Sequence, residues 1–496
     1  MSAVGDLVSP ETASGRVRGV RRDGAISFRG IPYATAPRFA APGPVPSWAG
    51  VREATEPGPA APQPARAIAA FTHGVLPATS EECLNLNVFT PSVTGSRPVL
   101  VWLHGGGFTI GHAGASLYDG SRLAKAADAV VVTVNYRLGS LGWLSHPRLA
   151  AAPDAATGNW GLLDQMAALE WVRQNIAGFG GDPQRVTLAG QSAGALCAID
   201  LLVAPGAAGL FRRTILQSPP LGDVAQPADV GAKWAQALSD AAGGTGPLDA
   251  SALRDLAAQR IVDLHEALLE APEFRGSRGG ALPTLDPVAL PHSPATTPGA
   301  RPDVDVLIGS TAQEGTFFFN SPWRPPPPPE RIAAIVGHLC HTDAPEIVID
   351  RYRRRATVQA RPTGRLSLLV DIATDMMVAG PAAAWASRRA KALAAGPGTV
   401  HRYRVDHPGA GGTLRATHTV DVPLLFGTWR DGGPGERLGG QAAGSAEVGR
   451  EIVQAWARFI HGGSPGWDRV SAGGGGDEIG VFGGSHPFTV EFESSR

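Results

Sequence analysis

Short runs of apolar residues, each bounded by turn-forming residues, recur along the chain and alternate with segments of helical spacing. This alternation is typical of a mostly parallel sheet flanked by helices, because parallel strands are buried on both faces. A different pattern at residues 24–34 predicts an antiparallel hairpin at one edge of the sheet. The apolar runs predict strands at residues 99–103, 129–134, 186–189, 214–218, 303–310 and 399–407.

Helical spacing is clearest at residues 161–179, where most of the apolar side chains fall on one face. Two longer segments, 228–272 and 329–395, are rich in Ala, Leu and Arg and do not fit the strand–helix alternation. We expect them to be helical cap segments over the end of the sheet at which ligands of such sheets bind. The sequence therefore predicts one α/β domain over residues 1–496, with two cap segments.

Length and charge narrow the class of protein. The chain has 496 residues, which would allow two or three domains, yet large α/β enzymes fill this length with one sheet and its insertions. Its 43 basic and 44 acidic side chains give no electrostatic reason to expect nucleic acid or a membrane as partner. Three cysteines argue against a disulfide framework. Because we see no secretory signal and no apolar run of ~18 residues, we expect a cytoplasmic protein.

The stretch from Gly190 to Gly194 reads Gly-Gln-Ser-Ala-Gly and matches the G-x-S-x-G pattern of a nucleophile elbow. In that turn a serine hydroxyl projects between a strand and a helix, which the two glycines allow to approach closely. Here an apolar strand pattern precedes Ser192 and an apolar helix pattern follows it. Ser192 is therefore the candidate nucleophile. The alternative is a buried serine that only caps the helix.

Residues 103–108 read Leu-His-Gly-Gly-Gly-Phe and follow directly from a predicted buried strand. Three consecutive glycines cost conformational entropy, so a plain tight turn is a poor explanation when the same chain carries the elbow. In an oxyanion hole of this geometry, backbone N–H groups of such a loop and of the residue after the nucleophile face one oxygen. We predict that Gly106, Gly107 and Ala193 supply these donors.

The chain resembles the type-B carboxylesterases of the α/β-hydrolase fold, a family that includes cholinesterases and bacterial para-nitrobenzyl-type esterases. The resemblance implies an α/β-hydrolase fold and hydrolysis of carboxylic esters by a serine nucleophile, with no metal or organic cofactor. It covers most of the chain and rests on motifs at residues 28–34, 80–91, 104–108, 134–143, 158–194, 215–219 and 310–319.

The chain order of the triad in this fold is serine, acid, histidine. Glu314 follows the predicted strand 303–310, where the family carries its acid; the alternative is a solvated loop carboxylate. His418 opens the segment His-Thr-Val-Asp-Val-Pro, which is similar to the catalytic-histidine segment of the family. The other histidines after Glu314 are His338, His341, His401, His407, His461 and His486.

The roles of these residues follow from the chemistry of the triad. His418 would accept the proton of Ser192 as the serine attacks the ester carbonyl, and would then donate it to the leaving alcohol. Glu314 would orient the imidazole and stabilise its charged form. Water would then repeat the sequence on the acyl-enzyme. The resemblance further implies that Ser218 and Asp421 hydrogen-bond around the histidine.

The chain keeps some of the residues that support the fold in this family and lacks others. The resemblance implies ion pairs of Arg38 with Glu81 and of Arg137 with Asp164, which we expect to support the fold. It would also imply a disulfide at Cys83, but the preceding loop has alanines where the partner cysteine would stand. We therefore expect Cys83 to be a free thiol.

Gln191 is a departure close to the expected reacting centre, because the family usually has glutamate immediately before the serine. Glutamine keeps the size of that side chain and its two hydrogen-bonding ends but removes its negative charge. The loop before Cys83 also lacks the tryptophan with which cholinesterases hold a quaternary ammonium. We therefore expect a small-molecule neutral ester, and not a choline ester, as the substrate.

Two other functions share this fold. An amidase or peptidase uses the same triad if it protonates a poorer leaving group. Comparing the activity on an aryl ester with that on the matching anilide would separate these enzymes from an esterase. A non-catalytic adhesion or scaffold member of the family would have lost the serine or another triad residue. This chain has the serine, the acid, the histidine and the glycine loop.

Overall fold

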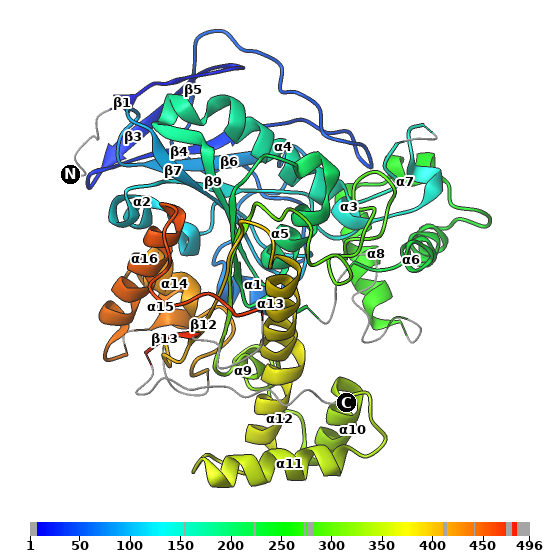
Figure 1. Ribbon diagram of the computed structural model, residues 1–496. Coiled ribbons are helices and arrows are strands. Elements are labelled where there is room, and N and C mark those ends of the chain that lie inside the picture. Colours follow the sequence, from blue (N-terminus) through cyan, green and yellow to red (C-terminus); the bar gives the residue numbers. More distant parts are fainter. Residues whose placement is uncertain are drawn as a thin grey trace.

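One sheet of 13 strands forms the core of the computed structural model, within the residues that it describes: 7–152, 155–221, 225–271, 274, 282–409, 414–440, 442–472 and 479–483. The strand order is β1-β3-β4-β6-β8-β7-β9-β10-β11-β12-β13, and β2 and β5 pair with β3 (Figure 1). From β8 to β13 neighbouring strands are parallel, whereas β1, β3, β4 and β6 form an antiparallel part. The strands are β1 Leu7–Val8, β2 Glu11–Thr12, β3 Gly15–Arg22, β4 Ala25–Pro32, β5 Val51–Glu53, β6 Asn85–Thr90, β7 Arg97–Leu103, β8 Val130–Val134, β9 Gly181–Gln191, β10 Arg213–Gln217, β11 Asp305–Thr311, β12 Val400–Val405 and β13 Ile479–Phe482.

The six predicted strands are confirmed as β7 to β12, and most of their residues are buried. The predicted hairpin is wrong in its extent, since residues 24–34 hold only its second arm, β4, and the first arm is β3. Its turn lies at Asp23 and Gly24, whose φ angles are 50° and 77°. Two consecutive positive φ angles match the twist of a two-residue hairpin turn.

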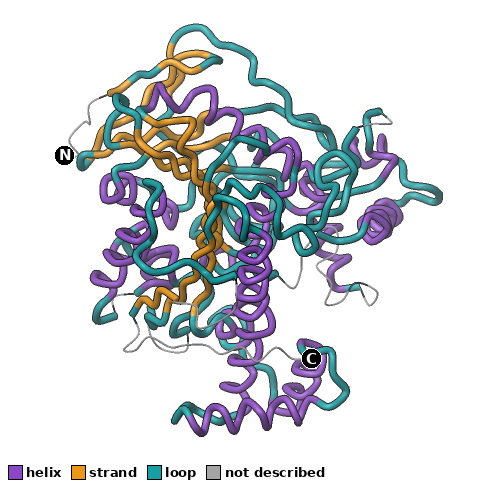
Figure 2. Tube along the Cα trace, in the orientation of Figure 1, coloured by secondary structure: helices purple, strands orange, loops and turns teal. Residues whose placement is uncertain are grey.

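Helices cover both faces of the sheet (Figure 1, Figure 2). Successive strand residues point to opposite faces, so Val99 and Val101 pack with α4, α5 and α13, while Leu100 and Trp102 pack with α2, α14 and α16. The helix predicted at residues 161–179 is confirmed as α4, with a short 3-10 turn at its end. The α-helices are α1 Ala67–Thr72, α2 Ser121–Ala127, α3 Gly139–Trp143, α4 Trp160–Asn175, α5 Ala193–Val203, α6 Ala228–Ala241, α7 Ala250–Asp255, α8 Ala258–Glu270, α9 Gly315–Phe319, α10 Pro329–Leu339, α11 Pro345–Val358, α12 Arg365–Thr374, α13 Gly380–Ala392, α14 Asp421–Phe426, α15 Gly433–Gly439 and α16 Ser445–Ile460.

The two predicted cap segments are helical, but they differ in where they lie. In 228–272, α6, α7 and α8 pack with α3 around the buried side chains of Trp234 and Ile261. In 329–395, α10, α11 and α12 form a small apolar cluster of their own that projects from the body (Figure 1). The last helix of that segment, α13, buries Trp385 and packs against β11 and β12. It therefore belongs to the layers of the sheet.

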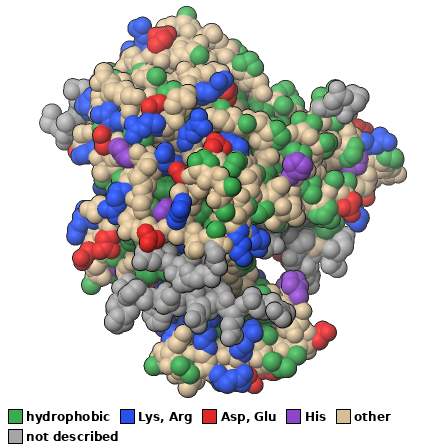
Figure 3. Space-filling view, in the orientation of Figure 1, with side chains coloured by type: hydrophobic (Ala, Val, Ile, Leu, Met, Phe, Trp, Pro, Cys, Tyr) green, Lys and Arg blue, Asp and Glu red, His purple; other side chains and the backbone are tan. Residues whose placement is uncertain are grey.

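One long apolar helix and the distribution of surface charge are relevant to possible partners. In the part of the chain that the structure describes, one helical run, Arg365–Ala392, is long and apolar enough to cross a membrane by length and composition alone. Half of its most apolar window is buried inside the protein, as in a core helix. Basic and acidic side chains are interspersed over the face seen in Figure 3. That distribution agrees with the balanced charge of the sequence.

Candidate active site

Ser192 lies in a strained turn between β9 and α5. Its φ and ψ angles are 55° and −122°, a region that a non-glycine residue adopts only when the surrounding structure imposes it. A Cβ atom on Gly190 would lie 2.4 Å from the carbonyl of Gly194, and one on Gly194 would lie 2.1 Å from the carbonyl oxygen of Leu103. Both glycines are thus required for the close packing of strand and helix, and Ser192 itself stays partly exposed.

The glycine loop after β7 packs directly against this turn. A Cβ atom on Gly105 would lie 3.2 Å from the Cβ atom of Ser192. Gly106 and Gly107 have φ angles of 122° and 61°, and a Cβ atom on Gly106 would lie 2.0 Å from a backbone oxygen of the same loop. Among the described residues, the N–H groups of Gly106 and Gly107 donate to no other backbone group. Ala193 opens α5, where an N–H has no partner within the helix.

Glu314 and His418 meet at the carboxyl ends of β11 and β12, which are neighbouring parallel strands. Nδ1 of His418 lies 2.5 Å from Oε2 of Glu314, and both side chains are buried. The other carboxylate oxygen accepts hydrogen bonds of 2.7 Å from Oγ of Ser218 and from the backbone N–H of Thr311. Donors therefore hold both oxygens of the carboxylate in place. The contribution of Thr311 was not foreseen, because it comes from the backbone.

Nε2 of His418 contacts Gln191 instead of Ser192. The side-chain nitrogen of Gln191 lies 3.0 Å from Nε2 of His418. Within the described residues, the hydroxyl of Ser192 makes no hydrogen bond with the imidazole. The structure thus brings together the acid and the histidine, and it places Gln191 at the nitrogen that would receive the proton of the serine.

Among the described residues, Asp421 is shown with no hydrogen bond to His418, although it interacts electrostatically with the imidazole. Its Oδ2 atom accepts hydrogen bonds from Nε2 of Gln217 at 2.7 Å and from the hydroxyl of Tyr403 at 3.2 Å. Burial raises the pKa of Asp421 to about 6, and the charge of Glu314 adds to this rise. The signal for Gln217 in the sequence is a polar residue at the end of a buried strand, directly before Ser218.

An aromatic wall borders His418. The rings of Phe317 and Phe318 on α9 lie 5.2 and 5.3 Å from the imidazole, centroid to centroid. Trp323 packs on Phe317 at 4.7 Å and on Phe71 of α1 at 4.6 Å. The motif after Glu314 includes the two phenylalanines, but nothing in the sequence places Trp323 and Phe71 against each other. Phe71 lies in the segment before Cys83 that lacks the tryptophan of the cholinesterases. Trp323, from a different segment, packs on its ring.

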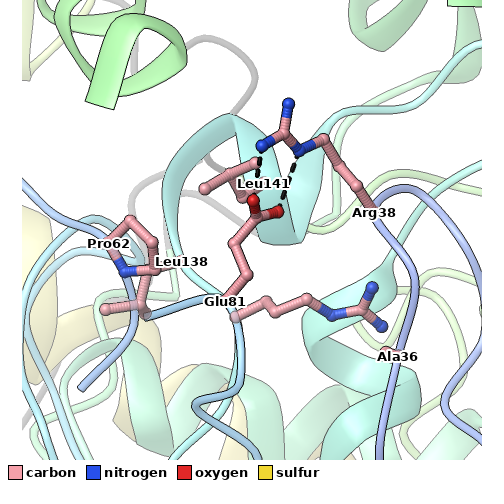
Figure 4. A pocket seen from close by; sticks show the side chains of 7 residues that line it. Ala36, Arg38, Pro62, Glu81, Leu138 and Leu141 are labelled. Carbon is pink, nitrogen blue, oxygen red and sulfur yellow. Dashed lines mark hydrogen bonds and ion pairs between the residues drawn. The ribbon is translucent and has the colours of Figure 1, made fainter. Parts of the chain in front are cut away.

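Both predicted ion pairs are confirmed. Arg137 and Asp164 are buried and share two side-chain hydrogen bonds of 2.7 and 2.8 Å. Arg38 pairs with Glu81 at the rim of a cavity that also contains Leu141 of α3 (Figure 4). The same guanidinium donates to backbone carbonyls at the end of α7. The pair therefore ties the first cap segment to the body.

The cysteines of the chain are not joined to one another, and Cys83 is buried. Burial raises the pKa of its thiol far above the ordinary value, which keeps the thiol protonated and unreactive. In the described part of the chain, no group of three His, Cys, Asp or Glu side chains could hold a metal ion.

Two buried histidines, one in the glycine loop and one just after it, predict that the protein is less stable in acid. Burial lowers the pKa of His104 and of His112 to about 4, and neither ring nitrogen of His112 has a hydrogen-bond partner among the described residues. Unfolding returns these pKa values to the ordinary ~6.5, so the unfolded state binds more protons between about pH 6.5 and pH 4. The free energy of unfolding should therefore fall as the pH drops through this window, by up to about 1.4 kcal/mol per pH unit for each histidine.

The variant His112→Phe isolates this contribution. Urea unfolding between about pH 7 and pH 4.5 should give a slope against pH that is smaller in this variant than in the wild type. Carboxylates contribute equally to the slope in both proteins, so their contribution cancels in the difference between the two slopes. Equal slopes would contradict the prediction.

Comparison with known proteins shows the family and the fold of the chain. The family model described as "Carboxylesterase family" matches residues 8–472. Para-nitrobenzyl esterase of Bacillus subtilis (strain 168) is 35% identical over 93% of this chain and 91% of that protein. A probable N-octanoylanthranilate hydrolase of Rhodococcus erythropolis is 35% identical over 89% and 90%. The solved structure of a thermophilic PNB esterase superposes with a TM-score of 0.80 and 33% identity, over 95% of this chain and 96% of that chain.

Proposed function

The chain belongs to the carboxylesterase family and is a carboxylic ester hydrolase of the α/β-hydrolase fold, and from this premise we propose that Ser192, Glu314 and His418 form its catalytic triad. The observation that carries the proposal is the short contact of 2.5 Å between the buried imidazole and the buried carboxylate, beside the strained turn that presents Ser192. A solvated loop carboxylate or a helix-capping serine would have no reason to be held in this arrangement.

The reaction begins with attack of the Ser192 hydroxyl oxygen on the ester carbonyl carbon. His418 accepts the hydroxyl proton at Nε2 while Nδ1 donates to Glu314, whose charge stabilises the imidazolium. The C–O bond to the alcohol breaks as His418 returns the proton to the leaving oxygen, and an acyl-serine remains. Water then attacks the acyl group by the same route and frees the acid. Every proton in this cycle moves through His418.

The negative charge on the carbonyl oxygen needs donors that already face it. The N–H groups of Gly106 and Gly107 and that of Ala193 are proposed to bind this oxygen. Gly105 of the same loop packs against Ser192, Ala193 directly follows it, and among the described residues none of the three N–H groups is shown donating to another backbone group. Loss of one such donor typically costs roughly 10²–10³ in rate. Gly106 must also stay glycine for a steric reason, since a Cβ atom there would overlap the loop.

Neutral esters are the proposed substrate class. The wall beside His418 is aromatic and uncharged, and the residue before the nucleophile is an amide. A carboxylate in place of Gln191 would attract a cationic alcohol: at an effective dielectric constant near 20, a unit charge ~4 Å away contributes up to about 4 kcal/mol before solvation losses. The para-nitrobenzyl esterase among the relatives agrees with an uncharged aryl group.

A cationic ester should therefore be hydrolysed less efficiently than its uncharged isostere. Gln191→Glu should narrow the difference in kcat/KM between the two esters, chiefly through KM. The two esters are measured side by side on the wild type and on the variant. Equal kcat/KM values for both esters, unchanged in the variant, would contradict the electrostatic preference and leave the triad untouched.

Amide hydrolysis is the second candidate function. One relative acts, by its printed name, on an N-acyl compound, N-octanoylanthranilate, and the proposed triad serves a nitrogen leaving group if His418 protonates it. A panel of aryl esters of increasing acyl length, with the matching anilides and with Ser192→Ala as control, separates the two functions. We expect kcat/KM for the esters to exceed that for the anilides at every chain length. The reverse order would establish an amidase.

A further inference from the structure

The side-chain amide of Gln191 occupies the position at His418 that the proposed reaction assigns to Ser192. Its nitrogen is 3.0 Å from Nε2 of His418, and the side chain is only 2% exposed. The oxygen of the amide lies close to Gly105, since a Cβ atom built on that glycine would come within 2.6 Å of it. Gln191 thus lies between the imidazole and the glycine loop, shielded from solvent.

The protons of this contact follow from its chemistry. An amide nitrogen only donates hydrogen bonds, so Nε2 of His418 accepts and carries a lone pair. The proton of the neutral imidazole is then on Nδ1, where it is donated to Glu314. This is the tautomer that a general base needs. The same lone pair must accept the hydroxyl proton of Ser192, however, and Gln191 already uses it.

We propose that Gln191 is a positioning residue, which holds His418 as the Nδ1–H tautomer in the resting enzyme and competes with Ser192 for the lone pair of Nε2. This inference rests on the function proposed for Ser192 and His418. When the imidazole takes up a proton at Nε2, that N–H and the amide N–H become two donors facing each other. The amide therefore opposes protonation of the resting imidazole, and it must move aside when the serine reacts.

Other groups that act on the charge of His418 are identical in every variant of Gln191. Glu314 binds Nδ1 directly. Asp421 interacts electrostatically with the imidazole. The rings that pack against it from α9, Phe317 and Phe318, carry no charge. A change in the pH dependence between variants therefore reports on the amide.

The test measures the rate at which a fluorophosphonate probe labels Ser192, as a function of pH from about 5 to 9. Gln191→Met removes the donor while keeping the volume of the side chain, and Gln191→Glu replaces the donor by a carboxylate. The matched control is Gln63→Met. Gln63 is also a buried glutamine, 4% exposed, and it hydrogen-bonds to the backbone of Gly111, three residues after the glycine loop, and not to His418.

We expect the acid midpoint of the labelling rate to rise by about 0.5–1 pH unit in Gln191→Met, the size of one net hydrogen bond. It should rise further in Gln191→Glu, because a neighbouring carboxylate also favours the imidazolium. Gln63→Met should keep the wild-type midpoint, whatever its effect on the absolute rate. A side chain that merely supports the fold would change rates and leave every midpoint in place.

A Gln191→Met midpoint at or below that of the wild type overturns the inference. If that variant does not fold, Gln191→Glu decides, and a midpoint no higher than that of the wild type overturns the inference in the same way. Absence of labelling at Ser192 in the wild type is a separate result, since it overturns the proposed triad itself.

Discussion

Ser192→Ala will remove covalent labelling by a fluorophosphonate probe and will lower ester turnover by roughly 10⁶-fold, the loss seen when the nucleophile of a serine hydrolase is deleted. The reason is chemical, because Ser192 carries the only hydroxyl group in the strained turn of residues 190–194 between β9 and α5. The remaining activity over the uncatalysed reaction would come from the oxyanion donors and from substrate binding. Mass spectrometry of the labelled wild type should find the probe on Ser192.

The control for this prediction is Ser140→Ala. Ser140 is a buried serine on α3 that hydrogen-bonds to His265 at 2.8 Å, outside the proposed site. Because Ser140 also contacts a histidine, it is the serine to test as the alternative site of labelling. If the probe modified Ser140, or if Ser192→Ala kept its turnover, the proposed nucleophile would be wrong.

His418→Ala will cost nearly as much as Ser192→Ala, and the double variant will be no slower than either single one. Residues that act as one unit give strongly non-additive losses, because removing any member disables the same step. In this chain the unit is joined by the contact between Nδ1 of His418 and Glu314, so Glu314→Gln should lose roughly 10⁴-fold. The measurement is kcat for the four variants on one aryl ester.

His461→Ala provides the matched control for this series. His461 follows α16, and its Nε2 atom lies 2.9 Å from the carbonyl oxygen of Ala127 at the end of α2, which has no part in the proposed site. We expect its kcat to be close to that of the wild type. Normal turnover by His418→Ala combined with loss of turnover in His461→Ala would show that the wrong histidine had been assigned, and additive losses would show that the residues act separately.

The strands and the two glycine-rich turns could be predicted because their causes are local. A strand of the parallel region is buried on both faces, so it reads as an apolar run, and β7 to β12 were found this way. The glycines around Ser192 are forced by contacts below 3 Å in the same turn or its neighbouring loop. Such constraints act on single positions and leave a mark in the sequence.

Parts of the prediction failed where long-range packing decides. The first arm of the hairpin was missed because β3 shows a half-buried pattern interrupted by arginines. Helix α13 was assigned to a cap from its composition, yet Trp385 packs it against the sheet. Composition and spacing describe one face of a helix, and they do not say which neighbour covers it.

The sequence by itself determined the α/β architecture, the serine between two glycines, the glycine loop beside it and the order of acid and histidine. Only the tertiary structure decided that Nε2 of His418 contacts Gln191, and that Trp323 packs on both Phe71 and Phe317, the latter beside the imidazole. The physical reason is distance along the chain. Gln191 and His418 are 227 positions apart, so their contact depends on the packing of the whole sheet and leaves no trace in either local sequence.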